Sequence, residues 1–300
     1  MKQHTILDNI EFTGVGLHTG EKTTIRICPA PVGYGFRFQR MDILGQPVLE
    51  ALTDFVVNTD RSTVLSKDNV KIGTTEHLLS AFFGMGLDNA LVQIWGGEIP
   101  VLDGSALPFV HKIKQTGLAV QQAEREYITI SAPITYTDTR SGATIDIIPS
   151  REFSVHVIID FNSRILGKQE FVYTEKTDYF QEIAASRTFV FLHEILDLFK
   201  KGLVKGGDLE NALVISEKEL SPEDLGLLRE LFNKPKLDIY KGYLNESGLR
   251  FPNECARHKT MDLLGDLMLA GKRIKASIRA YKPGHAANAA VAGLIRKQMK

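Results

Sequence analysis

The sequence is poor in the features that mark several classes of protein. It has 2 cysteines among 300 residues, Cys28 and Cys255, and they form no CxxC pair. So low a count excludes a disulfide framework and favours a reducing, cytoplasmic setting. Neither sign of charge is in excess, because 36 Lys and Arg residues balance 36 Asp and Glu residues. This balance argues against a nucleic-acid partner.

Long apolar runs are missing as well. No stretch approaches the roughly 18 apolar residues of a membrane-spanning helix, and residues 1–8 contain no apolar core of a signal peptide. We therefore expect a soluble protein without a membrane span, which can still act on a lipid-bearing substrate. A hydrophobic content of 43% and a length of 300 residues provide core for one large or two compact domains.

The order of strand and helix patterns predicts an α+β protein with two similar domains. Strands are expected within residues 1–50, at 90–95, within 127–161 and at 274–280. Helices are expected at 74–83, 179–185, 192–201, 221–232, 253–266 and the Ala-rich C-terminus, with a short one through Phe109 and Ile113. The polar stretch 121–126 is a candidate linker. We therefore predict domains at 1–122 and 127–300, each a sheet with helices on one face, so that the helices are sandwiched between the two sheets.

One polar stripe stands out on the helix expected at 253–266. His258, Asp262 and Asp266 follow one another at intervals of four residues, so a helix places them on one face. Buried charges without partners are costly. The stripe is therefore either exposed to solvent, with no function implied, or directed into a metal or catalytic site.

A second histidine, His77, begins another apolar helix that also ends at glycine and leads into a strand. If the two helix–strand units face each other, His77 meets His258. Two imidazoles and the carboxylate of Asp262 then form a typical catalytic zinc set, which leaves the fourth position for water with a pKa near ~7. Glu76 is placed to act as a general base, and His285 as a general acid whose pKa Asp266 raises.

Other readings of the motifs are less favourable. The segment Gly14–Thr23 resembles a phosphate loop, but Glu21 breaks the required spacing, so a turn that displays His18 is expected, with the role of His18 open. The remaining histidines, His4, His111, His156 and His193, are expected to be structural or exposed. A non-catalytic module with a structural zinc that includes Cys255 is a further alternative.

Six ordered motifs resemble one family. They are Gly-Val-Gly-Leu-His-Thr-Gly (14–20), Thr-Thr-Glu-His (74–77), Leu-Asp-Gly-Ser-Ala (102–106), Ser-Arg-Thr-Phe (186–189), Arg-His-Lys-Thr-Met-Asp-Leu-Leu-Gly-Asp-Leu (257–267) and Lys-Pro-Gly-His (282–285). Together they resemble the UDP-3-O-acyl-N-acetylglucosamine deacetylases, zinc amidohydrolases that commit Gram-negative bacteria to lipid A synthesis. Some members are fused to an acyl-carrier-protein dehydratase, which we do not expect within these 300 residues.

The resemblance implies a role for each matching residue. It implies that zinc is held by His77, His258 and Asp262, and that Glu76 is the general base and His285 the general acid. By the same resemblance, Asp266 supports His285, Thr188 stabilises the oxyanion and Lys259 adds positive charge. The implied substrate is a UDP-linked acylated amino-sugar that loses its 2-N-acetyl group. A monomer without nucleic acid is expected, and a zinc hydrolase for another acylated amino-sugar remains the alternative.

Contacts to the remainder of the substrate rest on the same resemblance. An apolar passage for the acyl chain is implied at Phe189, Phe191 and the segment 192–204. Asp160, Phe161 and Lys282 resemble contacts to the diphosphate and uracil. The sequence departs from the family in two places: Ala289 and Ala290 replace a polar pair after Asn288, and Glu194 stands where many members have Asp.

Overall fold

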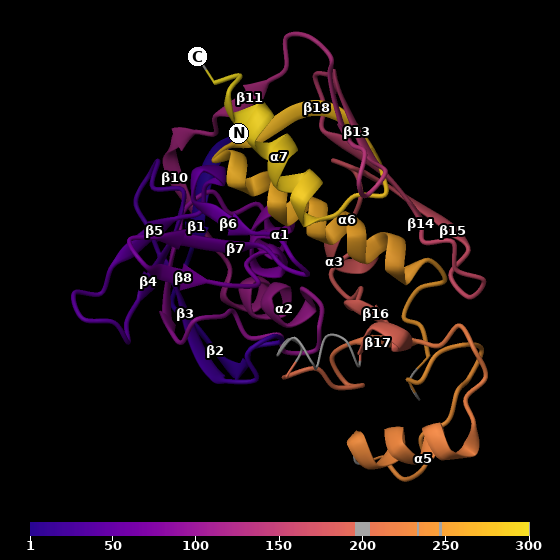
Figure 1. The fold of residues 1–300 in the computed structure, drawn as a ribbon. Helices are drawn as coiled ribbons and strands as arrows, with labels where there is room; N and C mark the ends of the chain where they lie inside the picture. The colour runs from indigo at the N-terminus through magenta and orange to yellow at the C-terminus, as the bar shows by residue number, and fades with distance from the viewer. Residues whose placement is uncertain (196–204, 233, 246–247, 300) are drawn as a thin grey trace.

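A layer of helices lies between two β-sheets (Figure 1). The computed structural model describes residues 1–195, 205–232, 234–245 and 248–299. The helices are α1 (Glu76–Met85), α2 (Leu107–Thr116), the short α3 (Tyr179–Glu182), α5 (Pro222–Leu231), α6 (Glu254–Leu267) and α7 (His285–Arg296). The expected α+β class is confirmed.

The two main sheets repeat one topology. The first has the order β2 (Ile10–Val15), β3 (Lys22–Pro29), β9 (Ala90–Trp95), β4 (Phe36–Arg40), β5 (Val48–Glu50). The second has the order β12 (Ile134–Asp138), β13 (Ala143–Pro149), β18 (Arg273–Tyr281), β14 (Ser154–Asp160), β15 (Lys168–Thr174), and β11 (Tyr127–Thr129) also pairs with β18. In each sheet the central strand is antiparallel to one neighbour and parallel to the other.

Smaller β elements complete the structure. β1 (Lys2–Ile6) pairs with β10 (Leu118–Glu124), and β16 (Phe189–Phe191) runs parallel to β17 (Leu213–Ile215). β6 (Val56–Asn58), β7 (Val64–Lys67) and β8 (Val70–Ile72) form a three-stranded sheet. Single 3-10 turns occur at Thr53–Phe55 and Met268–Ala270.

The central strands explain why the two halves meet through helices. α1 precedes β9 and α6 precedes β18, so each half contributes one buried helix to the layer between the sheets. Alternation directs one face of each strand inward: Ile25 and Ile27 of β3 are buried, whereas Thr24 and Arg26, which alternate with them, are half-buried. Apolar side chains from both sheets and both helices form one continuous core.

A glycine sets the distance between α1 and α6. A Cβ at Gly265 of α6 would overlap the backbone carbonyl of Glu76 at the start of α1. Glycine therefore permits the two helix backbones to approach closely at this position. As a result, the first turn of α1 lies directly against the face of α6 that carries Asp262 and Asp266.

Two expected features differ in the structure, and a third lies partly outside the described residues. The expected linker at 121–126 is wrong for residues 121–124, which complete strand β10 opposite β1. His285 is the first residue of α7 rather than part of a loop. In the segment 192–204, residues 192–195 are helical, and 196–204 lie outside the described residues.

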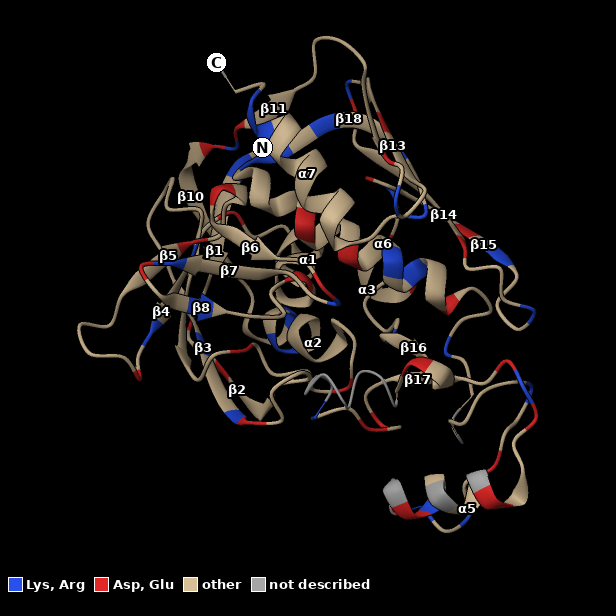
Figure 2. Ribbon diagram, viewed as in Figure 1, with Lys and Arg blue, Asp and Glu red and all other residues tan. Residues whose placement is uncertain are grey.

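Charged residues of both signs are interspersed along the ribbon in Figure 2, as the equal totals of acidic and basic residues lead one to expect. None of the described helices has the length and apolar character needed to cross a bilayer.

Candidate metal centre and catalytic site

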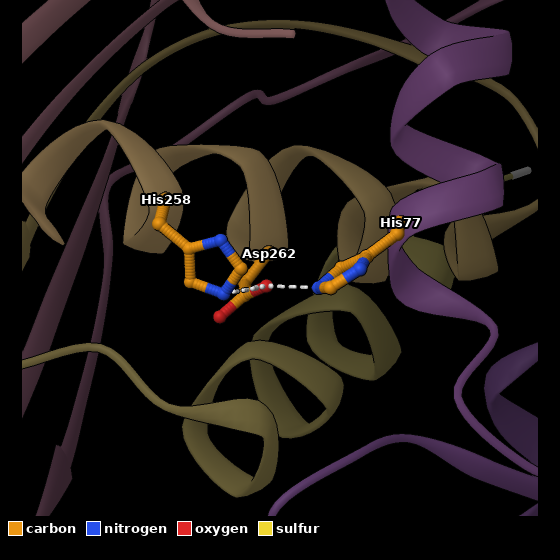
Figure 3. Close-up of side chains that lie close together, drawn as sticks. All are labelled: His77, His258 and Asp262. Atoms are coloured by element: carbon orange, nitrogen blue, oxygen red, sulfur yellow. Dashed lines mark ion pairs between the residues drawn. The ribbon is translucent and has the colours of Figure 1, made fainter. Parts of the chain in front are cut away.

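The side chains of His77, His258 and Asp262 converge between α1 and α6 (Figure 3). Nε2 of His77 lies 3.5 Å from Oδ1 of Asp262, and Nε2 of His258 lies 3.4 Å from the same oxygen. One atom from each residue falls within 4.8 Å of the other two, and all three residues are buried. Two imidazole nitrogens and one carboxylate oxygen therefore point at a common centre.

The local electrostatics favour the protonation states that bind metals. Burial lowers the pKa of His258 to about 3, so its imidazole is neutral. Burial acts to raise the pKa of Asp262, but electrostatic interactions with the His258 imidazole and the Lys259 ammonium outweigh burial and hold the pKa well below its usual range. A neutral imidazole and an ionised carboxylate are the ligand forms that a divalent cation requires.

The hydrogen bonds of this cluster also fit a cation. Nδ1 of His258 lies 3.2 Å from the carbonyl oxygen of Ser186, which directs Nε2 toward the centre. Oδ1 of Asp262 is buried, and no described residue hydrogen-bonds it. A buried carboxylate oxygen without a donor is costly, and a cation bound by His77, His258 and Asp262 satisfies it. The three residues thus fit a metal ion.

Glu76 lies beside this centre at the start of α1. Its side chain is buried, and Oε2 accepts a hydrogen bond of 3.0 Å from the backbone N–H of Thr63. Burial raises the pKa of Glu76, although the charges of His285 and His77 act to lower it. A carboxylate with a raised pKa is a stronger base than an exposed one, which suits proton abstraction near neutral pH.

His285 approaches the same centre from α7. Its Nε2 lies 4.0 Å from Oε1 of Glu76 and 3.9 Å from Oδ2 of Asp262, too far for a hydrogen bond to either. Its Nδ1 lies 3.0 Å from Oδ2 of Asp266. Burial acts to lower the pKa of His285, but the negative charges of Asp266 and Glu76 prevail and raise it to about 9. The imidazolium is thus stabilised, with Nε2 free to give a proton.

The carboxylate of Asp266 has several donors. Thr63 donates its hydroxyl to Oδ1 at 2.6 Å, and Asn288 donates its amide to Oδ2 at 2.9 Å. Asn288 thus retains a polar contact on α7, although Ala289 and Ala290 follow it. The bonds from Thr63 and Asn288 hold Asp266, and through it the ring of His285.

Thr188 and Lys259 both line the cavity beside the metal ligands. The backbone of Thr188 is held at both ends, because its N–H donates to Gly104 and its carbonyl accepts from Leu213. No described residue hydrogen-bonds its hydroxyl. Nζ of Lys259 lies 2.8 Å from Oδ2 of Asp262.

A buried ion pair supports the segment that carries Thr188. Nε of Arg187 lies 2.9 Å from Oε1 of Glu254, and the two side chains are 2% and 0% exposed. Oε1 of Glu254 also accepts from the backbone N–H of Arg187. The pair fixes residues 186–188 against the start of α6, where Ser186 reaches His258.

The metal ligands and several neighbouring residues line a cavity of about 470 Å³ that has polar and apolar lining residues. The polar ones include the metal ligands, Glu76, His285, Lys259 and His18. The apolar ones, here called the apolar region, include Phe189 of β16, which the sequence placed on the acyl passage. Arg61 also lines the cavity and forms a paired hydrogen bond with Glu194, the residue that departs from the family pattern.

The predicted nucleotide contacts lie outside the residues that line this cavity. Nζ of Lys282 lies 3.9 Å from Oδ2 of Asp160. The ring of Phe161 is 43% exposed and contacts the rings of Phe189 and Phe191 at 5.5 Å and 5.8 Å. Phe191 is buried in the main core and does not line the cavity.

Sequence reasoning did not find Thr63 or Glu98. Thr63 bonds both Glu76 and Asp266, yet it lies in a polar segment without a motif. Glu98 is buried and accepts hydrogen bonds from the backbone of His18 and from the hydroxyl of Thr74. It thereby fixes the turn that displays His18 toward the cavity, and no P-loop forms there. Burial lowers the pKa of His18.

Cys255 takes no part in the cluster of metal-binding side chains found among the described residues. It is a free, buried thiol whose pKa burial raises. The alternative of a structural zinc site that includes this cysteine therefore has no support in the geometry.

Comparison with known proteins gives one consistent family. The family model for UDP-3-O-acyl N-acetylglycosamine deacetylase matches residues 3–240 and 237–297. The chain is 38% identical to the UDP-3-O-acyl-N-acetylglucosamine deacetylase of Saccharophagus degradans, over 96% of this chain and 88% of that protein. It is 37% identical to the protein of the same name from Myxococcus xanthus, over 99% of this chain and 86% of that protein.

A longer relative is also similar. The chain is 42% identical to the bifunctional enzyme LpxC/FabZ of Bacteroides thetaiotaomicron, and all of this chain is covered. The chain spans 65% of the length of that relative.

Proposed function

Because the chain belongs to the UDP-3-O-acyl N-acetylglycosamine deacetylase family, we propose that it hydrolyses an acetamide on a UDP-linked amino-sugar. The substrate is UDP-3-O-(3-hydroxyacyl)-N-acetylglucosamine, and the products are the free 2-amine and acetate. This reaction is the committed step of lipid A biosynthesis. The observation that carries the proposal is the convergence of His77, His258 and Asp262 beside a carboxylate and an imidazole with raised pKa values.

We assign zinc as the metal, because two imidazoles and one carboxylate are a typical catalytic zinc set. When bound by His77, His258 and Asp262, zinc supplies a Lewis acid that polarises a carbonyl and acidifies water.

Glu76 and His285 move the protons of the reaction. Glu76 takes a proton from the water that attacks the acetyl carbon, and its raised pKa suits this role. His285 donates a proton from Nε2 to the nitrogen of the departing amine, so that the C–N bond breaks to give a neutral amine. Asp266 keeps His285 charged until that step. The 4.0 Å between Glu76 and His285 leaves neither group bound to the other.

Thr188 and Lys259 stabilise charge on the substrate. The hydroxyl of Thr188 donates to the carbonyl oxygen as that oxygen becomes negative, a role that suits a donor on a rigid backbone. Lys259, whose ammonium lies 2.8 Å from the metal ligand Asp262, adds a positive charge to the cavity. Asp160, Phe161 and Lys282 are assigned to the UDP group, and Phe189 and the segment 192–204 to the acyl chain, whereas Phe191 is not assigned to it because it is buried in the main core.

We further propose domains at 1–122 and 127–300, with Glu76 and His77 supplied by the first and the other catalytic groups by the second. The repeated sheet topology supports this division. A monomer suffices, because one chain supplies every group named above. Cytoplasmic location is favoured by the two free cysteines.

Product analysis tests the proposal. The purified protein is incubated with the UDP-sugar, and acetate and free amine are measured. We expect both products in equal amounts from the wild type and at least ~10²-fold slower turnover in Glu76→Gln. Glu11→Gln, on the exposed face of β2, is the matched control. Equal turnover in both variants would refute the role of Glu76, and faster hydrolysis of substrates that lack UDP or the acyl chain would favour another acylated amino-sugar.

A further inference from the structure

The apolar region of the cavity is built from three distant parts of the chain. Most of it comes from β16, β17 and the residues next to them, while Leu17 follows β2 and Phe232 follows α5. Among the described residues, the apolar side chains that line the cavity are Leu17, Phe189, Val190, Ile195, Ala212, Val214 and Phe232. The region is therefore lined almost entirely by groups that favour a hydrocarbon chain over water.

The two strands β16 and β17 separate this region from the main core. Val190 pairs with Val214 in the parallel register, and both side chains line the cavity. The next residues along, Phe191 and Ile215, are buried in the main core. Because neighbouring residues of a strand point to opposite faces, the face with Phe191 and Ile215 packs on the core and the face with Val190 and Val214 lines the cavity. Phe189, at the start of β16, also reaches the cavity.

A second, smaller apolar cluster lies on the side of β16 and β17 that carries Val190 and Val214. It contains the buried Ile195, Leu209, Val214, Leu237 and Leu244, against which Val190, Leu192, Leu228, Phe232 and Ile239 are packed. We call these residues the α5 cluster, because Leu228 and Phe232 connect helix α5 to it. In Figure 1, α5 lies at the edge of the molecule, on the side of β16 and β17 away from the two main sheets.

Phe232 is the point at which α5 meets the cavity. It follows the last residue of the helix, and its N–H donates to the carbonyl of Leu228. Nε of Arg229 donates to the carbonyl of Leu237 at 2.9 Å, which ties the end of α5 to the segment that follows it. Among the described residues of α5 and the turn after it, Phe232 alone lines the cavity.

We propose that Phe232 forms the end wall of the apolar region and thereby sets the length of acyl chain that the protein accepts. The inference rests on the proposed function, in which the acyl chain lies against Phe189. A chain that reaches Phe232 buries its last methylene against the ring, and a longer chain must displace the ring or bend. In a filled apolar pocket, one methylene changes discrimination about tenfold or more.

Binding of saturated fatty acids of increasing length, measured by calorimetry on the metal-loaded protein, tests this directly. In the wild type, affinity should rise with chain length, reach a maximum and then fall. In Phe232→Ala the maximum should move to longer chains by at least one two-carbon step, with about tenfold tighter binding of the first chain beyond the wild-type optimum. Phe232→Trp should move the maximum toward shorter chains.

Leu228→Ala is the matched control. Leu228 packs in the α5 cluster but does not line the cavity, so its truncation loosens α5 without removing the end wall. The position of the maximum should stay unchanged in this variant. An unchanged maximum in Phe232→Ala, or the same displacement in Leu228→Ala, would overturn the proposal.

Acetate release from UDP-sugars of graded acyl length separates this inference from the proposed function. If the wild type releases no acetate while the fatty-acid maximum still moves in Phe232→Ala, the proposed function fails and the end wall stands. If acetate is released with one length profile in all variants, the end wall fails and the proposed function stands.

Discussion

Nδ1 of His285 lies 3.0 Å from Oδ2 of Asp266, and both side chains are removed from solvent. Asp266 is an anion fixed by Thr63 and Asn288, so it cannot turn away from the imidazole. The position of His285, and a large part of what keeps it charged, therefore depend on a neighbour that does not itself line the cavity.

Asp266→Asn should lower the pKa of His285. The wild-type pKa is raised to about 9 because the charges of Asp266 and Glu76 outweigh burial, and loss of one charge favours the neutral imidazole. The imidazolium is then lost at lower pH, so the alkaline limb of the pH profile of kcat/KM should move to lower pH. Asp54→Asn, at an exposed pair with Arg296, should leave the limb in place. An unmoved limb in Asp266→Asn would contradict the assignment.

His258→Ala should abolish stoichiometric metal binding. The variant removes one of the two imidazoles that face Asp262 and leaves too few ligands to hold a cation tightly. Metal analysis after gel filtration measures the bound zinc per chain. His156→Ala removes a half-exposed histidine that pairs with Glu170 on the second sheet, and it should retain full occupancy. Full retention in His258→Ala would exclude this residue as a ligand.

Thr188→Val should lower kcat about 10²-fold while KM changes little. The hydroxyl is assigned to the carbonyl oxygen only as that oxygen gains charge, and loss of such a donor affects the transition state more than the bound substrate. Steady-state kinetics measure both parameters. Thr188→Ser keeps a hydroxyl and should recover most of the lost rate. A variant series in which only KM rises would indicate a binding role instead.

Glu254→Ala should destabilise the protein by about 3–5 kcal/mol, because it leaves the guanidinium of Arg187 buried without its anion. Urea unfolding followed by circular dichroism measures the free energy of unfolding. Glu11→Ala removes an exposed partner of Arg26 and should cost no more than about 1 kcal/mol. Similar losses in the two variants would show that the buried pair adds no more stability than a surface pair.

The central part of the site follows from local spacing. His258, Asp262 and Asp266 share a helix face because residues four apart always do. Their side chains are buried, so the stripe is not a solvated surface and faces the metal and catalytic site. The strand at 90–95 was also predictable, since its alternation reflects one buried face. Such features depend on neighbours in sequence, so the sequence contains them.

Features that depend on distant partners were harder to predict. The polar residues of 121–124 resemble a linker, because β1 is the one strand among the described residues that pairs with β10, and many side chains of β10 face solvent. Tertiary pairing, rather than propensity, makes this segment a strand. Thr63 gave no signal for a similar reason: its partners Glu76 and Asp266 come from two helices, and only the packing of α1 on α6 brings them together.

Gly265 shows how an inactive variant can arise without the loss of any reacting group. A methyl group there would collide with the carbonyl of Glu76. Even Gly265→Ala must therefore push apart helices α1 and α6, which carry the metal ligands. Catalytic constellations tolerate displacements of only about 0.5 Å. A random mutagenesis screen would therefore recover this position together with the histidines, although it contributes no functional group to the chemistry.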